Sequence, residues 1–483
     1  MLNRLRERVR ARPDQLALVF NDEKISYWGL LENISAARGF LQSRGLRAGD
    51  LLALGFGSCP AFVYAFYAAL SLGLQIWPLN TKSKEAELLP LMQKLKPKLI
   101  LYSPKQDFLS SSAACSLADF KSQMQDLKGS YELLPVKGAQ VLIHSSGSTG
   151  RPKAVVIEEG NLLAALDAYA VFELKKTVLA SPIFHITGLV GILAFALDRG
   201  ACVFLQERFA ADEVLALIER EHVDFLHASY SLYALLLQEA KQQKLSSIPC
   251  VKTLLCGAGP LPEHAARGLL QLFSSASMHP VYGLSESSSP FCIYQENDYL
   301  EGGKIGSSGL PVLSSQISIR DADFKELPAG EIGRIFIKGP TVIKGYLNGA
   351  FSELFKDGFL DSKDLGYVDA DGFLFVKDRE KDMINRGGEK IYCHEVEEMI
   401  SSFLGVREVA LAKRFSELYL EEPVAFLVVQ KDFKEELLKD FLKSNLSAFK
   451  RPVDFIYLDA LPKTATGKVD KQKLSKLLNK ENG

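Results

Sequence analysis

Short apolar runs bounded by turn residues alternate with segments of helical spacing along most of the chain. Runs rich in Leu, Val and Ile at 16–20, 51–56, 98–102 and 253–256 predict buried β-strands. Apolar positions recur every three to four residues in 211–221, which predicts an amphipathic helix. Alternating strands and helices are typical of an α/β fold, and we expect one here.

Two longer apolar runs raise the question of a membrane segment. Residues 62–77 end directly at Pro78, and residues 186–205 are interrupted by Asp198 and Arg199. A membrane-spanning helix needs about 20 continuous apolar residues, so neither run fits well. We expect each run to form a buried helix, or a helix followed by a strand. The charged N-terminus has no apolar core behind it, so no signal peptide is expected.

The pattern also marks irregular stretches and a change of character. Residues 110–119 are rich in Ser and Ala, and we expect a loop there. Residues 353–397 are dense in Asp, Lys and Gly and predict short pieces joined by turns. Helical spacing follows at 395–404 and at 435–446, and two apolar runs within 409–429 predict strands between these helices.

The last part of the chain therefore resembles a self-sufficient α+β unit of about 100 residues, within the usual size range of a domain. At 483 residues the chain is also too long for a single hydrophobic core. We predict an α/β protein of two domains. Residues 1–379 form a large N-terminal domain of β-sheets flanked by helices, and residues 380–483 form a small α+β C-terminal domain.

Composition narrows the function classes. Hydrophobic residues make up 47% and charged residues 24% of the chain, as in ordinary globular proteins. The net charge of -1 argues against nucleic acid as a partner. The seven cysteines are scattered without paired spacing, which argues against a disulfide framework or a zinc site. Reduced thiols of this kind favour the cytoplasm.

Candidate chemistry begins in a loop between two apolar runs, 141–143 and 154–157, which predict strands on either side. Glycines let backbone N–H groups turn towards an anion, while hydroxyls and cations add donors and charge. The loop is not a Walker motif, because a proline would break the helix that must follow. A flexible linker is the alternative, but the flanking strands favour a hairpin loop that holds a polyphosphate. The loop consists of Ser145, Ser146, Gly147, Ser148, Thr149, Gly150, Arg151, Pro152 and Lys153.

Six further motifs follow this loop. They are PIFHITG (182–188), CGAGPL (256–261), YGLSE (282–286), DLGYVDADGFLFVKDREKD (364–382), GGEKIYCHEVE (387–397) and PKTATGK (462–468). Together with the loop they resemble the acyl-adenylate-forming superfamily, which includes acyl-CoA synthetases, nonribosomal adenylation domains and firefly-type luciferases. Seven motifs in the family order, over essentially the whole chain, make the resemblance specific.

The resemblance implies an enzyme that activates a carboxylate in two steps. A carboxylate is a poor electrophile, so AMP is first transferred to it from ATP with release of pyrophosphate. CoA then displaces AMP and forms a thioester. Such a site must bind a triphosphate, a nucleoside and a divalent metal, and must neutralise the charge that grows between two anions. The implied cofactors are ATP, Mg2+ and CoA as a substrate.

The resemblance also implies roles for the nucleotide motifs. The loop 145–153 would hold the β- and γ-phosphates, and Tyr282 would stack on adenine. Glu286 would bind Mg2+, for which a carboxylate oxygen is a suitable ligand. Gly283 and Ser285 belong to the same nucleotide motif. Without the resemblance, Tyr282 would be a core tyrosine and Glu286 a residue at a helix start.

Asp364 and Arg379 would hold the ribose, since a carboxylate accepts more than one hydrogen bond. The family usually has Thr-Gly-Asp at this point, whereas this chain has Ser362, Lys363 and Asp364. Losing the glycine either alters the turn or adds a cation near the nucleotide. The turn between the adenine and the acyl pocket in the family corresponds to Gly257, Ala258 and Gly259.

Lys468 would act in the adenylation step, where its long side chain reaches between the carboxylate and the α-phosphate. Without the family motif, it would be one of several lysines in a solvated tail. Lys381 matches the hinge about which the small, mobile domain rotates between the two steps. After rotation, Gly387 and Gly388 would help to form the CoA tunnel. Cys393 stands where the family usually has proline, without removing a needed functional group.

His185 helps to choose the branch of the family. Amino-acid-activating domains generally carry Asp after the corresponding Phe, whereas a histidine resembles CoA ligases, where an aromatic pair gates the acyl pocket. We therefore count His185 with Lys468 and Glu286 as catalytic. A hydrogen-bonded core histidine is the alternative reading of His185.

The identity of the acid is less sharply indicated. The acyl pocket is expected near 227–231, 256–259 and 282–288, which offer small, polar and aromatic side chains and no single charged partner. The stretches at 338–348 and 364–382 are similar to o-succinylbenzoate–CoA ligases of menaquinone synthesis, which we favour slightly. Medium-chain fatty acyl and aryl-CoA ligases are close competitors. An adenylating enzyme that loads a carrier protein, and a catalytically silent binding protein, are further alternatives.

The expected partners are accordingly small molecules: a carboxylate, ATP and CoA. We expect no nucleic acid and no integral membrane contact. A monomer and a homodimer are both compatible with the sequence.

Overall fold

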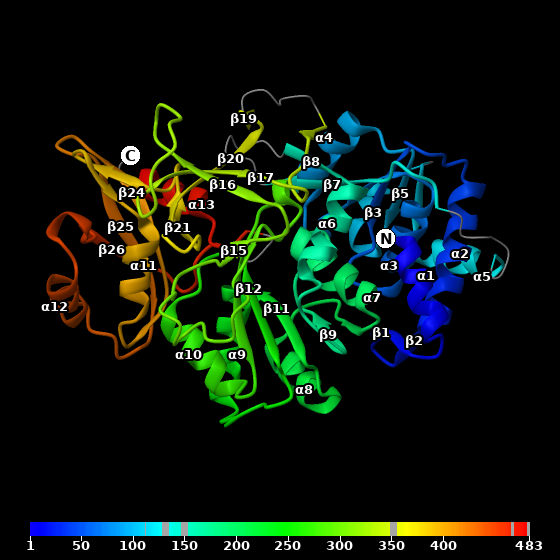
Figure 1. Cartoon of the computed structure of the whole chain (residues 1–483), viewed down its shortest axis with the longest axis horizontal. Coiled ribbons are helices and arrows are strands. Elements are labelled where there is room, and N and C mark those ends of the chain that lie inside the picture. The colour runs from blue at the N-terminus through cyan, green and yellow to red at the C-terminus, as the bar shows by residue number, and fades with distance from the viewer. Residues whose placement is uncertain (112, 128–134, 146–152, 348–354, 465–467, 481–483) are drawn as a thin grey trace.

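The computed structural model describes residues 1–111, 113–127, 135–145, 153–347, 355–464 and 468–480. Four β-sheets form the framework of these residues. In Figure 1 the N-terminal strands and helices lie at one end of the long axis, and the C-terminal strands and helices lie at the other. The α/β class predicted from the sequence is confirmed.

The largest sheet has mostly parallel strands in its centre, with antiparallel strands at both edges. Carboxyl ends of parallel strands meet at one edge of a sheet, which prepares that edge for a ligand. The predicted strands at 16–20 and 253–256 belong here and are confirmed. In spatial order the nine strands are β15 (Leu310–Pro311), β14 (Cys292–Ile293), β13 (Ser277–Tyr282), β12 (Thr253–Gly257), β11 (Phe225–Ser229), β9 (Lys176–Leu179), β10 (Cys202–Leu205), β1 (Leu16–Phe20) and β2 (Glu23–Ser26).

A second sheet contains the hairpin that was predicted around the Ser- and Gly-rich loop. Its strands β7 and β8 are antiparallel and pair Ser145 with Lys153, so the two flanking strands are confirmed. The predicted strands at 51–56 and 98–102 are also confirmed. In spatial order the seven strands are β18 (Gly345–Tyr346), β8 (Lys153–Glu158), β7 (Gln140–Ser145), β4 (Gln75–Pro78), β3 (Leu51–Gly55), β5 (Leu99–Tyr102) and β6 (Ala114–Ser116).

The loop predicted at 110–119 is wrong in part. Strand β6 pairs with β5 there and buries Cys115, and helix α5 (Leu117–Gln125) begins immediately after it. Ser116 starts the helix, since its hydroxyl oxygen accepts a hydrogen bond from the backbone N–H of Asp119 at 3.1 Å. Residues 114–119 therefore form a short edge strand and the start of a helix rather than a loop.

Two fully buried helical segments lie between the two large sheets. All twelve residues of α3 (Pro60–Ser71) and all eight of the π-helical segment η2 (Thr187–Ala194) are buried. One hydrophobic core includes α3, η2, residues of the seven-stranded sheet such as Val155, and residues of the nine-stranded sheet such as Val203. The two sheets therefore share one core.

The same segments answer the question about the long apolar runs. Residues 62–77 contain α3 and β4, and residues 186–205 contain η2, α7 (Phe195–Arg199) and β10, as expected. Among the described residues, no helix is both long enough and apolar enough to cross a membrane. The predicted helix at 211–221 is confirmed as α8. The remaining helices of this region are α1 (Leu2–Ala11), α2 (Tyr27–Ser43), α4 (Glu85–Leu95), α6 (Glu159–Tyr169), α8 (Ala211–Glu221), α9 (Tyr230–Gln242) and α10 (Glu263–Leu272).

A third, antiparallel sheet follows in the chain, and its longest strand, β20, pairs with both β17 and β21. Its strands are β16 (Gln316–Arg320), β17 (Gly333–Lys338), β20 (Phe359–Val368), β19 (Phe355–Lys356) and β21 (Leu374–Arg379), which pairs with β20.

The described C-terminal part contains the fourth sheet, three α-helices and the 3-10 helix η4 (Ala448–Lys450), and its hydrophobic clusters contain only residues from 384 onwards. The predicted helices and strands between 395 and 446 are confirmed, with both strands longer than expected. The predicted domain boundary near 379–381 falls between β21 and β22. The elements are β23 (Glu389–Ile391), β22 (Ile384–Arg386), β25 (Leu420–Val429), β24 (Val406–Ser416), β26 (Asp454–Tyr457), α11 (Cys393–Ser401), α12 (Glu435–Asn445) and α13 (Lys471–Lys480).

Candidate active site

Candidate site residues gather at the carboxyl ends of the parallel strands in the nine-stranded sheet. Ser181 follows β9, and β11, β12 and β13 end at Ser229, Gly257 and Tyr282. In open α/β sheets, ligands bind outside these carboxyl ends. The sheet topology therefore brings Ser181 and Tyr282, which are about 100 residues apart in the sequence, to the same edge of the sheet.

A cavity lies at this edge and joins distant parts of the chain. His185, just before η2, and Lys468, close to the C-terminus, both line it, so the structure brings two of the predicted catalytic residues together. Ala258, at a φ of 65°, contributes the predicted turn after β12. The lining consists of Ser181, Pro182, His185, Thr187, Ser229, Leu232, Ala258 and Lys468.

His185 is a neutral side chain at physiological pH. Desolvation, together with the positive charge of Lys468 and the neighbouring His227, lowers the pKa of its imidazole to about 3. Its Nδ1 accepts a hydrogen bond from the backbone N–H of Thr187 at 3.3 Å. His185 therefore lines the cavity as a neutral group, and its proposed gating role stays a prediction.

The ammonium group of Lys468 has a lowered pKa. The residue is exposed as a whole, yet its surroundings lower the pKa of its ammonium group to about 8, with desolvation by the protein as the largest cause. Repulsion from Arg379 lowers the pKa as well, and attraction from Asp364 opposes both effects. The same interactions show that Lys468 lies within electrostatic reach of the two predicted ribose residues.

Adenylate formation should therefore lose efficiency at alkaline pH. A lysine with a pKa of about 8 is protonated below that pH and loses its charge as the pH rises through it. We expect kcat/KM for ATP, measured by pyrophosphate release, to be level near neutrality and to fall above pH 8, because this parameter reports ionisation in the free enzyme. In Lys468→Arg the guanidinium stays charged, so the residual activity should lack this fall. An identical alkaline fall in that variant would assign it to another group.

Asp364 lies at the centre of a second cluster, on paired strands of the third sheet. Residue 364 on β20 is directly opposite Arg379 on β21. Its Oδ1 accepts a hydrogen bond from Arg379 Nε at 3.0 Å, and its Oδ2 accepts one from the Tyr282 hydroxyl at 2.7 Å. Burial raises the pKa of Tyr282 well above its usual value, with the Asp364 carboxylate adding to the effect, so the phenol stays a donor. The predicted adenine and ribose residues are thus brought into direct contact.

Glu286 lies in a short 3-10 turn, η3 (Ser285–Ser287), and is held from two sides. Its Oε1 accepts a hydrogen bond from the Tyr346 hydroxyl at 2.8 Å, and its backbone oxygen accepts one from the N–H of Ile343 at 2.9 Å. Tyr346 on β18 pairs with Val155 on β8, the strand that follows the Ser- and Gly-rich loop. Glu286 is therefore tied to the strand that follows the predicted phosphate loop.

This donor set fits Mg2+. The ion usually takes one or two protein carboxylates and completes its oxygen shell with nucleotide phosphates and water. Among the residues described, no three His, Cys, Asp or Glu side chains gather around a common metal position. A single carboxylate, Glu286, linked through Tyr346 to the strand that follows the predicted phosphate loop, would suit an ion that arrives with its nucleotide.

Other predicted residues lie elsewhere. Ser145 and Lys153 form the ends of the β7–β8 hairpin, while residues 146–152, which include Ser146, Gly147, Ser148, Thr149 and Gly150, lie outside the described part of the chain. Their phosphate-binding role stays a prediction. Gly259 follows β12, and Gly283 follows β13.

The hinge and CoA residues are not part of the cavity lining. Lys381 is exposed on the segment between β21 and β22. Gly387 and Gly388 form the turn between β22 and β23, with φ values of 61° and 98° that suit glycine. Their roles would require a different orientation of the C-terminal part, and they stay predictions.

Sequence reasoning missed Tyr346. The residue is in the stretch 338–348, which was singled out for its similarity alone, and its contact with Glu286 joins positions 60 residues apart. A tyrosine gives no signal of such a partner, because the contact depends on how β18 pairs with β8.

Comparisons with known proteins identify the family of the chain. The family described as "AMP-binding enzyme" matches residues 5–347, and its C-terminal domain, "AMP-binding enzyme C-terminal domain", matches residues 395–468. The 2-succinylbenzoate–CoA ligase of Bacillus licheniformis is 32% identical over 490 aligned residues, covering 98% of this chain and 99% of the relative.

Solved structures show the same similarity. The o-succinylbenzoate CoA synthetase of Bacillus subtilis in complex with the acyl-adenylate intermediate OSB-AMP has a TM-score of 0.85 and 28% identity, covering 98% of this chain and 97% of that one. The same enzyme in complex with ATP and magnesium ion has a TM-score of 0.86 and 28% identity, covering 98% of this chain and 99% of that one.

Proposed function

The chain belongs to the AMP-binding enzyme family and is an AMP-forming acid–CoA ligase, and from this premise we propose that it joins 2-succinylbenzoate to CoA. The observation that carries the choice of acid is the end-to-end similarity to 2-succinylbenzoate–CoA ligases, both in sequence and in fold. The cavity lining is compatible with this acid, because it combines small and polar side chains with the apolar Leu232 and one cation, Lys468.

In the first step the enzyme uses ATP to convert the carboxylate into an acyl-adenylate. Asp364, Arg379 and Tyr282 hold the nucleoside, and their mutual hydrogen bonds fix these side chains before the nucleotide arrives. Lys468 places its ammonium group between the carboxylate and the α-phosphate, where two anions must approach each other. Glu286 would hold Mg2+, which when bound offsets the charge of the triphosphate.

In the second step CoA displaces AMP, and for this we assign the mobile part of the chain to residues 380–483 with a hinge at Lys381. Two observations support this assignment. Lys381 is exposed between two sheets, and the Gly387–Gly388 turn is absent from the cavity lining although the family pattern gives it a role there. Rotation about the hinge exchanges Lys468 for this turn at the cavity.

A cytoplasmic location follows from the same proposal. All seven cysteines are free thiols, and six of them are buried. Reduced thiols persist in the cytoplasm, where ATP and CoA are available to such an enzyme.

The test is pyrophosphate release with ATP and Mg2+ across a panel of acids, each with and without CoA. We expect 2-succinylbenzoate to give the largest CoA-stimulated rate, with kcat/KM at least about tenfold above that of benzoates or fatty acids, because buried polar groups are left unpaired by the wrong acid. Mass spectrometry of the thioester identifies the product. A control without carboxylate gives the background of ATP hydrolysis.

Other outcomes point elsewhere. A fatty or aryl acid as best substrate would replace 2-succinylbenzoate and keep the ligase. Pyrophosphate release that CoA does not stimulate, with acyl transfer to a carrier protein, would favour a carrier-loading enzyme. ATP binding without turnover on any acid would favour a silent binding protein.

A further inference from the structure

Strand β20 presents Asp364 on a bulge. The ladder between β17 and β20 is interrupted between Asp361 and Leu365, so that three residues of β20 lie opposite one residue of β17. Ser362 closes the bulge, because its Oγ donates to the backbone oxygen of Ile335 at 2.7 Å and accepts from the N–H of Asp364 at 3.1 Å. The direction of the Asp364 carboxylate therefore depends on the shape of this bulge.

Lys363 lies at the tip of the bulge in a conformation that favours glycine. Its φ is 62°, in the left-handed region that residues with a Cβ rarely adopt. Both of its backbone polar groups are engaged: its N–H donates to Asp361 Oδ1 at 3.0 Å, and its oxygen accepts from the N–H of Glu380 at 3.1 Å. The side chain doubles back as well, with Nζ donating to Asp361 Oδ2 at 2.6 Å.

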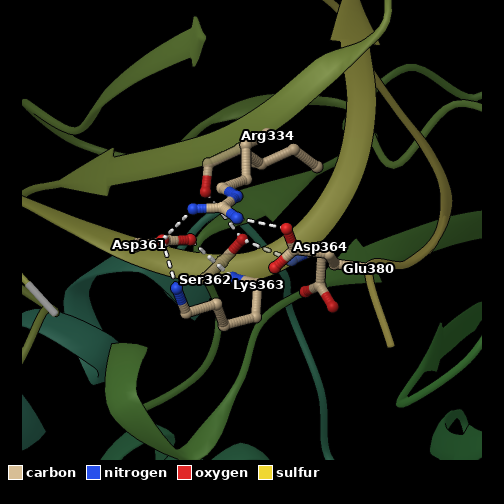
Figure 2. Close-up of polar contacts among 7 residues, drawn as sticks. Arg334, Asp361, Ser362, Lys363, Asp364 and Glu380 are labelled. Carbon is tan, nitrogen blue, oxygen red and sulfur yellow. Dashed lines mark hydrogen bonds and ion pairs between the residues drawn. The ribbon is translucent and has the colours of Figure 1, made fainter. Parts of the chain in front are cut away.

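Four charged side chains around this bulge are linked by successive ion pairs. We call this set the bracket; it consists of Lys363, Asp361, Arg334 and Glu380. Figure 2 shows Asp361 between Lys363 and Arg334. Arg334 donates to Asp361 Oδ2 at 3.2 Å and also pairs with Glu380. The Asp361 side chain is only 4% exposed, and a buried carboxylate is tolerated when cations pair with it. Two cations and two anions alternate, so the bracket balances its own charge.

The bracket holds the backbone at residues 361–363, immediately before Asp364, which is proposed to bind the ribose. Asp364 already accepts from Tyr282 and Arg379, and useful contacts to two ribose hydroxyls need its oxygens placed to within about half an ångström. A glycine at position 363 would adopt the left-handed turn on its own. A lysine there makes the turn depend on its partner, Asp361.

We propose that Lys363, acting through Asp361, positions Asp364 and thereby sets how strongly the enzyme distinguishes ribose from deoxyribose nucleotides. Lys363 is a positioning residue, because its ammonium group is directed to Asp361. The proposal rests on the proposed function in one respect, namely that Asp364 binds the ribose.

The test is equilibrium binding of ATP, 2′-deoxy-ATP and 3′-deoxy-ATP to the full chain by calorimetry. Lys363→Ala keeps the unfavourable turn and loses the ion pair, so ATP should bind about tenfold more weakly while the deoxy nucleotides change little. Lys363→Gly restores an unstrained turn and should stay within about threefold of the unmodified chain for every nucleotide. Lys356→Ala removes an exposed lysine of the same sheet, on β19, and should change nothing.

Asp361→Asn provides a second variant and should lower the preference for ATP in the same way, with its melting temperature reported alongside. Equal weakening of all three nucleotides in Lys363→Ala would show a merely structural role and overturn the inference. So would an unchanged preference in both Lys363→Ala and Asp361→Asn. If the unmodified chain itself does not prefer ATP, the ribose role of Asp364 fails together with the inference. Inactivity on 2-succinylbenzoate with the nucleotide preference intact overturns only the proposed acid.

Discussion

Lys468→Ala should lower the rate of acyl-adenylate formation by about 10²–10³-fold, the range seen when one preorganised charged or polar donor is removed from a transition state. The reason lies in the cavity, where Lys468 is the cation next to His185 and within reach of Asp364 and Arg379. Pyrophosphate release measures this step. Conversion of supplied acyl-adenylate and CoA to thioester should stay largely intact, because that step does not need charge between a carboxylate and the α-phosphate.

A matched control is available in the same segment. Lys473 is an exposed lysine that pairs with Asp470 at 3.2 Å, and Lys473→Ala should leave both half-reactions unchanged. Equal loss of both half-reactions in Lys468→Ala would mean that the lysine supports the structure rather than the chemistry.

Lys381→Pro should have the opposite effect on the two steps. Proline fixes φ and removes the backbone N–H, so it hinders rotation at this position. We expect thioester formation from supplied acyl-adenylate and CoA to fall by on the order of tenfold to a hundredfold, while adenylate formation is retained, because conformational steps of this kind can limit turnover. Single-turnover measurement of each half-reaction separates the two effects.

Lys381→Ala separates the backbone effect from the loss of the side chain. The residue is exposed, and the turn around it is held by backbone hydrogen bonds from Asp382 and Met383 to the oxygen of Arg379. Alanine preserves that turn and should keep both half-reactions within about threefold, as for exposed positions generally. Unimpaired thioester formation in Lys381→Pro would contradict the rotation model.

Much of the framework could be predicted from local pattern. The helix at 211–221 has strong helical periodicity, and the strands on either side of the Ser- and Gly-rich loop are continuous apolar runs bounded by turn residues, so local pattern is informative for both. The stretch at 110–119 was misjudged because an edge strand of three residues and a serine at a helix start have the same composition as a loop. Pairing with β5, not composition, makes β6 a strand.

In the candidate site, too, some residues could be predicted from the sequence and others depend on how the strands pair. Family motifs pointed to Tyr282, Asp364 and Arg379, and the structure places these three in direct hydrogen-bond contact. Arg334 and Asp361 gave no such signal, because their role depends on how β17 pairs with β20 around the bulge. The departure at Lys363 was visible in the sequence, but only the structure shows that the left-handed turn is kept and that an ion pair supports it.

The core shared by the two large sheets has a consequence for synthesis on the ribosome. Strand β1, near residue 16, pairs with β10, near residue 203, and β8 pairs with β18 at residues 345–346. The nine-stranded sheet needs β15 at residues 310–311 and the seven-stranded sheet needs β18, so both are complete only when about 346 residues have emerged, which takes roughly 20–70 s at ordinary elongation rates. During this interval the core around α3 and η2 is incomplete, so the nascent chain exposes these two segments, all of whose residues are buried in the folded protein. Molecular chaperones that bind nascent chains would therefore find their main targets within the first 200 residues.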